Sequence, residues 1–285
     1  PLWFAGLRYL LAGVVISVVA AATGRFRPQD RSEWLSIGLT GGFVVAGYHG
    51  LLYLGTAVIS GSISSVIVSL SPVLTTVAAG AVLADESPGA TDALGLLFGL
   101  GGVVVIANPG GSEIPLSGVA LVFVGVTMFA SGSVGLRALD PDLPAASLQG
   151  WSMLLGSTML AGGAILRGEQ FPVGVASGES ALPFVYLVFG AAVVGYLIYF
   201  DLLSRIGPVR VNYVAYLEPV TAAMVAWGVL GRAPTATTTT GFLLVAGGFA
   251  LATVDDPLKR LGLRSEGIVH SDLSENGSVE VHYAD

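Results

Sequence analysis

The residues with the clearest chemistry are Glu218 and Pro219, near the middle of the apolar segment Val209–Gly231. A charged side chain at the centre of a bilayer costs about 2.5–3.5 kcal/mol on insertion scales, so such residues mark functional sites by default. A Glu that is neutral in one state and charged in another would suit a proton-coupled carrier, whereas pairing with a hydroxyl or with Arg8 is the structural alternative. Proline removes a helical hydrogen bond, which predicts a helix break or hinge at Pro219.

A second version of this segment occurs earlier in the chain. Displacing the sequence by 147 residues places Leu70–Val73, with Pro72, on Leu217–Val220. With one residue dropped, Gly101–Gly102 falls on Gly247–Gly248. The chain therefore consists of two related halves, each with a proline near the centre of a spanning helix.

Other polar and aromatic residues lie on helices expected to line a substrate path. Arg8 can bind a carboxylate with two parallel hydrogen bonds, but it can also pair with Glu218 or extend to the outer interface. His49 and Tyr53 share a helix face at i and i+4, and a lone His in an apolar helix is more often structural than a proton carrier. Tyr53 and Phe200 are equivalent in the two halves, which favours a packing role for that pair. The further candidates are Ser65, Ser69, Tyr196, Tyr199, Asn212 and Tyr216, which could instead bond their own helices or sit in the interfacial aromatic belt.

Composition places all these residues in a membrane. Of 285 residues, 53% are hydrophobic and 11% charged, against about 25% charged in soluble domains. Long apolar runs recur, which predicts an all-α polytopic membrane protein with nine visible spanning helices. The expected spans are Pro1–Ala22, Trp34–Leu54, Ile59–Leu83, Ala90–Ala107, Ile114–Leu136, Ala145–Leu166, Leu182–Ser204, Val209–Leu230 and Thr237–Val254.

The sequence argues against several kinds of site. The absence of cysteine excludes disulfides and thiol catalysis, and three His without paired spacing predict no metal site. We expect no cofactor. The net charge of −7 is a poor guide to partners, because the acids gather in the C-terminal tail, and nothing in the sequence indicates a nucleic acid partner. The GxxxG spacings at Gly38/Gly42 and Gly95/Gly99 predict close helix contacts, not phosphate-binding loops.

The distribution of basic residues predicts how the helices are oriented in the membrane. With the loop Thr23–Glu33 in the cytoplasm, nine Lys or Arg fall on that side and only Arg167 and Arg232 fall outside. This predicts a multi-pass protein of the cytoplasmic membrane with a cytoplasmic C-terminus. The two proline helices then run in opposite directions, as in the inverted repeats of many transporters. The expected divisions are a first repeat at 1–110, which lacks its first helix, a second repeat at 111–256, and a basic collar with an acidic, disordered tail at 257–285.

Short motifs along the chain resemble those of a known family. The opening Pro1–Ala12 is similar to the second helix of EamA-type transporters of the drug/metabolite transporter superfamily. Ser71–Val73 with Leu83–Glu86 resembles the end of that family's first repeat, and Leu217–Val220 resembles the second. The resemblance implies ten helices in two inverted five-helix repeats, cytoplasmic termini, and export or exchange of small metabolites such as amino acids. Gly231–Arg232 departs from the pattern, which often carries an acidic residue there.

These observations predict a secondary transporter that moves a small metabolite, an amino acid or related compound, by alternating access. The alternative is a membrane-embedded enzyme or a protein that handles lipids or isoprenoids, which would need convergent acids, a His pair or a metal cluster. We expect no enzymatic activity. The expected partners are a small-molecule substrate, the lipid bilayer and, as a coupling ion, protons, in a monomer or weak homo-oligomer.

Overall fold

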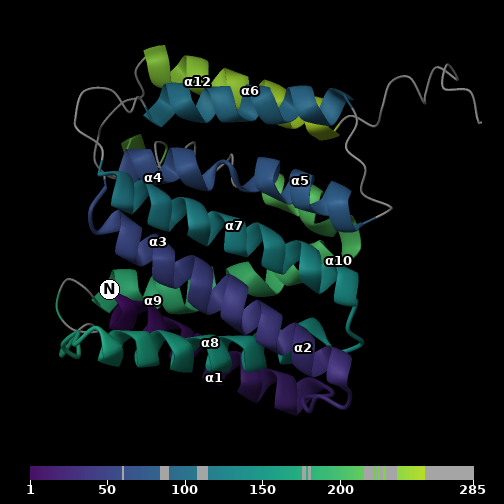
Figure 1. The fold of residues 1–285 in the computed structure, drawn as a ribbon, viewed down its shortest axis with the longest axis vertical. Helices are drawn as coiled ribbons and strands as arrows, with labels where there is room; N and C mark the ends of the chain where they lie inside the picture. Colours follow the sequence, from purple (N-terminus) through teal and green to yellow (C-terminus); the bar gives the residue numbers. More distant parts are fainter. Residues whose placement is uncertain are drawn as a thin grey trace, which may run out of the picture. The chain divides into compact units, whose positions relative to one another are not determined.

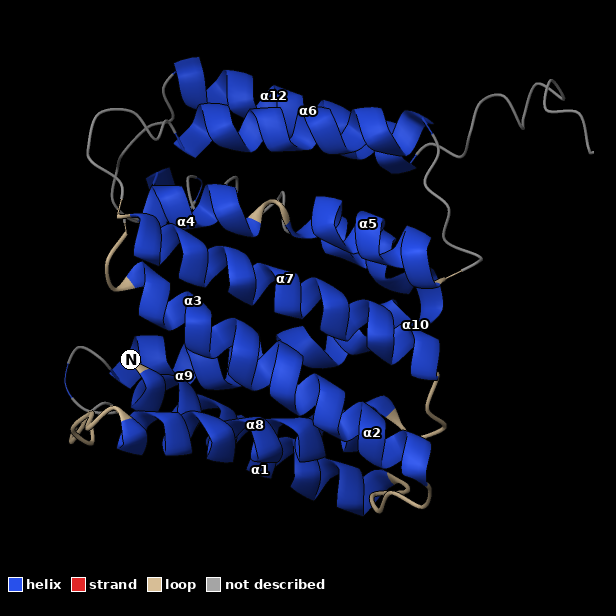
Figure 2. Cartoon of the chain, viewed as in Figure 1, coloured by secondary structure: helices blue, strands red, loops and turns tan. Residues whose placement is uncertain are grey.

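The computed structural model describes residues 1–59, 61–83, 90–107, 115–174, 178, 181–214, 221, 224, 227–228 and 236–253. All regular structure in these residues is helical (Figures 1 and 2). The elements are α1 (Leu2–Thr23), α2 (Arg31–Leu39), η1 (Thr40–Tyr48), α3 (His49–Thr56), α4 (Gly61–Val68), α5 (Ser71–Val82), α6 (Ala90–Ala107), α7 (Leu116–Leu139), α8 (Ala145–Leu166), α9 (Ala181–Val185), η3 (Tyr186–Gly195), α10 (Tyr196–Asn212) and α12 (Ala236–Thr253).

The predicted all-α membrane fold is confirmed. Five helical runs of the described chain are long and apolar enough to cross a membrane. They are Leu2–Ala22, Arg31–Thr56, Ile63–Val82, Leu116–Leu139 and Ala181–Asn212. The expected span Val209–Leu230 lies outside the described residues from position 215 onward, apart from isolated positions, and so do Tyr216, Glu218 and Pro219.

The span that contains Pro72 is interrupted, as its proline predicts. α4 ends at Val68 and α5 begins at Ser71, with a turn at Ser69 and Leu70 between them. Pro72 occupies the first turn of α5, where a missing N–H removes no intrahelical hydrogen bond. The turn at Ser69 and Leu70 therefore separates the helical register of α4 from that of α5, and Ser71 begins the second of these helices.

Two π-helices occupy corresponding positions in the chain. Displaced by 147 residues, η1 would cover 187–195, almost the range of η3, Tyr186–Gly195. Similarly, α6 displaced by 146 residues covers 236–253, the bounds of α12. π-helices are rare and often occur at functional sites. Each one here directly precedes a candidate site residue, His49 after η1 and Tyr196 after η3.

Glycine brings α6 and α12 into backbone contact, and the two helices lie side by side (Figure 1). A Cβ added to Gly248 would stand 2.6 Å from the Gly99 nitrogen and 2.7 Å from the Gly95 carbonyl oxygen. A Cβ added to Gly102 would stand 2.7 Å from the Gly241 carbonyl oxygen. The close contact predicted at Gly95/Gly99 is therefore present.

The other predicted GxxxG contact is displaced by one residue. A Cβ on Gly38 would meet nothing within 4 Å, and one on Gly42 would only touch a side-chain methyl at 4.0 Å. Gly41 makes the close approach instead, since its Cβ would stand 2.8 Å from the Ser152 carbonyl oxygen of α8. The prediction at Gly38/Gly42 is wrong because η1 begins at Thr40, and its wider turns change which residue faces the neighbour.

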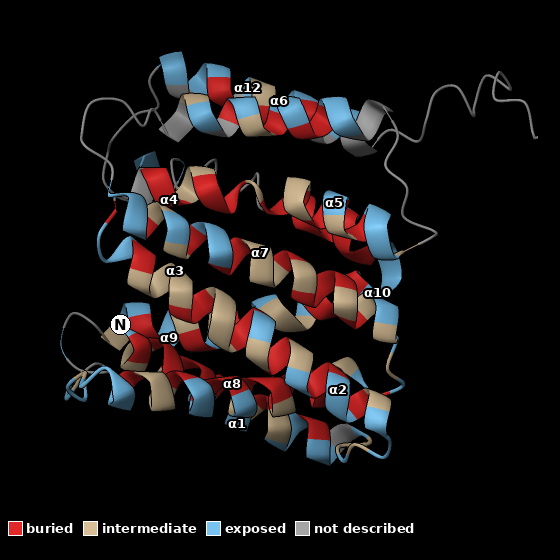
Figure 3. Cartoon of the chain, viewed as in Figure 1, coloured by how far each residue is buried: buried red, intermediate tan, exposed pale blue. Residues whose placement is uncertain are grey.

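Burial follows the helix contacts. Figure 3 shows buried residues along the contacts between neighbouring helices and exposed residues on their outer sides. Large apolar side chains are among the exposed ones, including Val18, Leu97 and Leu243. An apolar outer surface of this kind is suited to contact with lipid.

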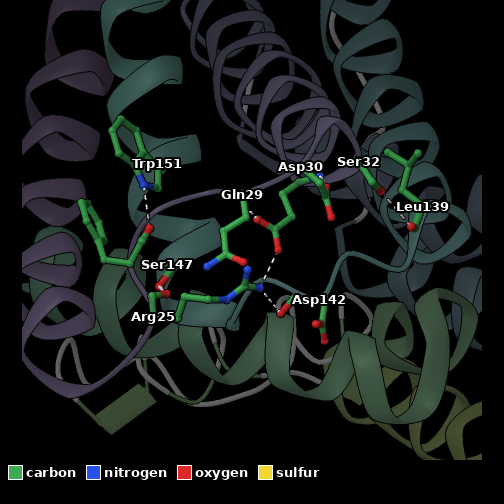
Figure 4. Close-up of polar contacts among 10 residues, drawn as sticks. Arg25, Gln29, Asp30, Ser32, Leu139, Asp142, Ser147 and Trp151 are labelled. Atoms are coloured by element: carbon green, nitrogen blue, oxygen red, sulfur yellow. Dashed lines mark hydrogen bonds and ion pairs between the residues drawn. The ribbon is translucent and has the colours of Figure 1, made fainter.

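A polar cluster ties the loop after α1 to the start of α8 (Figure 4). Arg25 donates to a carboxylate oxygen of Glu33 at 2.5 Å and to the Asp142 carbonyl at 2.5 Å. The Arg25 carbonyl accepts a hydrogen bond from Ser147 at 2.7 Å. Glu33 is 1% exposed, and its carboxylate accepts from Arg25 and from the Gln29 backbone amide at 2.7 Å. The cluster thus joins elements of the two expected halves.

Candidate functional site

A cavity of about 300 Å³ lies among helices from both expected halves. This volume is at the lower end of the range for small-molecule pockets, about 300–1,000 Å³. The lining residues are Arg8, Tyr48, His49, Val68, Ser71, Phe129, Ala191, Gly195, Tyr196, Tyr199, Asn212 and Val214. We call it the central cavity, because Phe129 lies near the middle of α7, and Ala191, Gly195 and Tyr196 lie in the middle of the run Ala181–Asn212.

Arg8 brings a positive charge to the wall of the central cavity. Its side chain is 6% exposed and donates to the Tyr53 hydroxyl at 2.7 Å and to the Tyr9 hydroxyl at 2.8 Å. Its guanidinium carbon lies 4.6 Å from the centre of the Tyr9 ring. Within the described residues no carboxylate forms an ion pair with Arg8, and its Nε has no hydrogen-bond partner. A buried cation whose partners among the described residues are neutral can accept an anionic group of a ligand.

His49 is held by two hydrogen bonds. Its Nδ1 lies 3.0 Å from the Val44 carbonyl in η1, and a carbonyl can only accept, so Nδ1 carries the proton. Its Nε2 is hydrogen-bonded with the Tyr196 hydroxyl at 2.9 Å. The Tyr9 ring packs on the imidazole with ring centres 4.7 Å apart. With both nitrogens occupied, His49 orders the cavity wall.

A string of neutral polar groups forms another part of the wall. The Tyr199 hydroxyl lies 2.9 Å from Ser133 Oγ and donates to Asn212 Oδ1 at 3.3 Å. Asn212 Nδ2 donates to Thr75 Oγ1 at 2.9 Å. Ser133, Asn212 and Thr75 are all buried. The string thereby connects α7, α10 and α5.

The structure brings together much of the set expected from the sequence. Arg8, His49, Tyr196, Tyr199 and Asn212 line the central cavity, and Tyr53 contacts it through Arg8.

Ser65 and Ser69 are not among the residues that line the central cavity. Ser69 Oγ donates to the Ser65 carbonyl of its own helix at 2.7 Å. Ser71 takes their place in the wall, and its hydroxyl has no hydrogen-bond partner among the described residues. Displacement by 147 residues places Ser71 on Glu218, so the repeat could have identified it. Tyr9 and Thr75 were missed because their role depends on the contacts of neighbouring helices.

No group of three His, Asp or Glu side chains that could hold a metal ion occurs in the part of the chain that the structure describes.

Together, the apolar spanning helices and the polar central cavity define the class of polytopic membrane transporters. The chain matches the EamA-like transporter family over residues 1–108 and 116–254, and it belongs to that family.

Relatives agree with this assignment, and a solved structure shares the fold. A chloroplastic WAT1-related protein of Arabidopsis thaliana is 26% identical over 234 residues, which are 79% of this chain and 56% of that protein. The uncharacterized inner membrane transporter YedA of Escherichia coli K12 is 25% identical over 81% of this chain and 74% of its own length. The uncharacterized transporter YvbV of Bacillus subtilis is 24% identical over 86% of this chain and 80% of its own. A solved crystal structure, 21% identical, shares the fold with a TM-score of 0.77 over 92% of this chain and 89% of that one.

Proposed function

We propose that this membrane protein is a secondary transporter that carries a small metabolite with an anionic group, an amino acid or related compound, through the central cavity. The observation that carries the proposal is the buried Arg8 guanidinium, whose partners in the described structure are two tyrosine hydroxyls. A substrate carboxylate can neutralise this positive charge and fit the planar guanidinium with two hydrogen bonds. The aromatic wall made by Tyr48, Phe129 and Tyr196 suits the apolar part of such a substrate.

Transport would proceed by alternating access between two inverted repeats, 1–110 and 111–256. The two segments that match the family, and the correspondence of η1 with η3 and of α6 with α12, support this division. A gradient or an exchanged solute would supply the energy, with Glu218 as the site of proton coupling. In this arrangement the loop Thr23–Glu33 and the C-terminus face the cytoplasm, and the substrate leaves by export or exchange.

The test is flux through the purified full-length protein in proteoliposomes. A mixed pool of labelled amino acids is offered for uptake and counterflow, and the medium is analysed for new products. Saturable flux without product supports the transporter. A product formed without flux would contradict it and favour the membrane-embedded enzyme or lipid-handling protein.

A further inference from the structure

A second cavity of about 230 Å³ lies next along the same helices. On α7, the central cavity is lined by Phe129 and the second cavity by Leu136 and Arg137, about 10 Å further along the helix at 1.5 Å per residue. On α10, Tyr199 lines the central cavity and its neighbour Phe200 lines the second one. We call this second space the inner cavity. Its lining is Leu136, Arg137, Asp140, Pro141, Asp142, Leu143, Ala145, Leu148, Phe200, Leu203 and Ser204.

The wall between the two cavities has a polar and an apolar part. The polar part is the string that joins Ser133, Tyr199, Asn212 and Thr75. The apolar part is Phe200, which is 3% exposed and lies with its ring centre 5.3 Å from that of Tyr199. Tyr199 of the polar part and Phe200 of the apolar part are consecutive residues of α10. One layer of aromatic side chains therefore separates the two cavities.

The polar string also spans a break in the backbone. α10 contains Gly207 with φ 81° and ψ 164°, a left-handed conformation that favours glycine and divides the helix into two segments. Tyr199 precedes this break and Asn212 follows it, so their hydrogen bond joins the two segments. A change of angle at Gly207 would separate them without disturbing either helical segment.

We propose that the two cavities are consecutive chambers of one substrate path, and that Tyr199 and Phe200 form the gate between them. The proposal rests on the function proposed above. In the structure described here the gate is closed: the Tyr199 hydroxyl is fixed from α7 and from the segment after Gly207, and Phe200 fills the space beside it. Movement at Gly207 breaks the bond to Asn212 and withdraws both rings together.

Cysteine accessibility tests the gate without any substrate, so its outcome is independent of whether transport is found. The 285 residues contain no cysteine, so each thiol introduced among them is a unique label site in this sequence. Ser204→Cys reports on the inner cavity and Ala191→Cys on the central cavity. A membrane-impermeant maleimide is added separately to spheroplasts and to inverted vesicles, and Ser204→Cys identifies the face that opens to the inner cavity.

From that face we expect Ser204→Cys to react quickly and Ala191→Cys slowly. Adding Tyr199→Phe, which removes only the hydroxyl, should speed the reaction of Ala191→Cys about fivefold, the factor expected for loss of one hydrogen bond. Phe200→Leu should act in the same direction. Tyr186→Phe is the matched control, because the Tyr186 side chain is exposed on the outside of η3.

The proposal is overturned if Ala191→Cys reacts as fast as Ser204→Cys in the parent, or if neither gate variant changes its rate. Size-exclusion profiles confirm that each variant is folded. The labelling rate of Ser204→Cys should be the same with and without the gate substitutions, which shows that they change access to the central cavity alone.

Discussion

Arg8 and His49 line the same cavity but differ in how their polar atoms are satisfied. Both His49 nitrogens have partners within the protein, whereas the Arg8 Nε has none in the described structure. The sequence predicted both as site residues because polar groups in apolar helices are costly. It also included Ser65 and Ser69, which do not line the central cavity, and the helix that carries Ser65 is interrupted by a turn at Ser69 and Leu70.

Proton coupling should therefore depend on Glu218 and not on His49. We expect His49→Gln to retain the pH dependence of flux, because an amide can replace the imidazole as a hydrogen-bonding group in the wall. Glu218→Gln should abolish that dependence, because an amide cannot titrate. Initial rates in proteoliposomes over a range of external pH measure both effects. A pH profile that is unchanged in Glu218→Gln contradicts the coupling proposal, and one lost only in His49→Gln transfers the role to the imidazole.

Among the elements, the sequence predicted helix bounds well where one apolar run ends in a loop. Ala90–Ala107 and Ala145–Leu166 are observed with the bounds expected. It did not predict the π-helices η1 and η3. A π-helix has wider turns than an α-helix, but an apolar segment has the same composition in either form, so composition does not distinguish them. Nor did it indicate which glycine of a pair faces the neighbouring helix, since this depends on the rotation of the helix about its axis.

The glycine pairs of α6 and α12 allow a matched test of the contact between these helices. Gly248→Ala and Gly102→Ala should each destabilise the protein by about 1–3 kcal/mol, because the new methyl would overlap the facing backbone. Their neighbours Gly247→Ala and Gly101→Ala add a methyl with nothing within 4 Å and should leave stability unchanged or slightly higher. Apparent melting temperatures in detergent compare the four variants. Equal melting temperatures within each pair would refute the backbone contact.

The loop after α1 allows a second matched test. Arg25→Gln removes charge-assisted hydrogen bonds to buried Glu33 and to the Asp142 carbonyl, for which we expect a loss of about 1.5–3 kcal/mol. Arg27→Gln makes the same substitution two residues away at an exposed position and should cost less than about 0.5 kcal/mol. Thermal unfolding followed by size-exclusion chromatography measures the difference. Equal melting temperatures for Arg25→Gln and Arg27→Gln would show that the contacts of Arg25 do not contribute to stability.

For the whole molecule, composition and apolar periodicity were sufficient to predict the membrane fold, and the resemblance of short motifs indicated the transporter family. They were not sufficient to predict the two cavities, because a cavity is defined by side chains from helices far apart in the chain. Arg8 and Tyr199 are 191 positions apart in the sequence (199 − 8), yet they line one space. The equivalent residues His49 and Tyr196, 147 positions apart, are also hydrogen-bonded to each other beside it. This contact is what two helices from related halves would make if they met at a common axis.

The most direct measurement of the central claim is counterflow of labelled amino acids in proteoliposomes containing Arg8→Gln, beside Arg167→Gln as control. Arg167 has a side chain that is 58% exposed, so its loss changes charge without touching the cavity. Losing a buried partner for a substrate carboxylate costs about 2–5 kcal/mol, so Arg8→Gln should raise the KM by about 30-fold or more, while Arg167→Gln should behave as the parent. Unchanged KM and maximal flux in a folded Arg8→Gln protein would contradict the account.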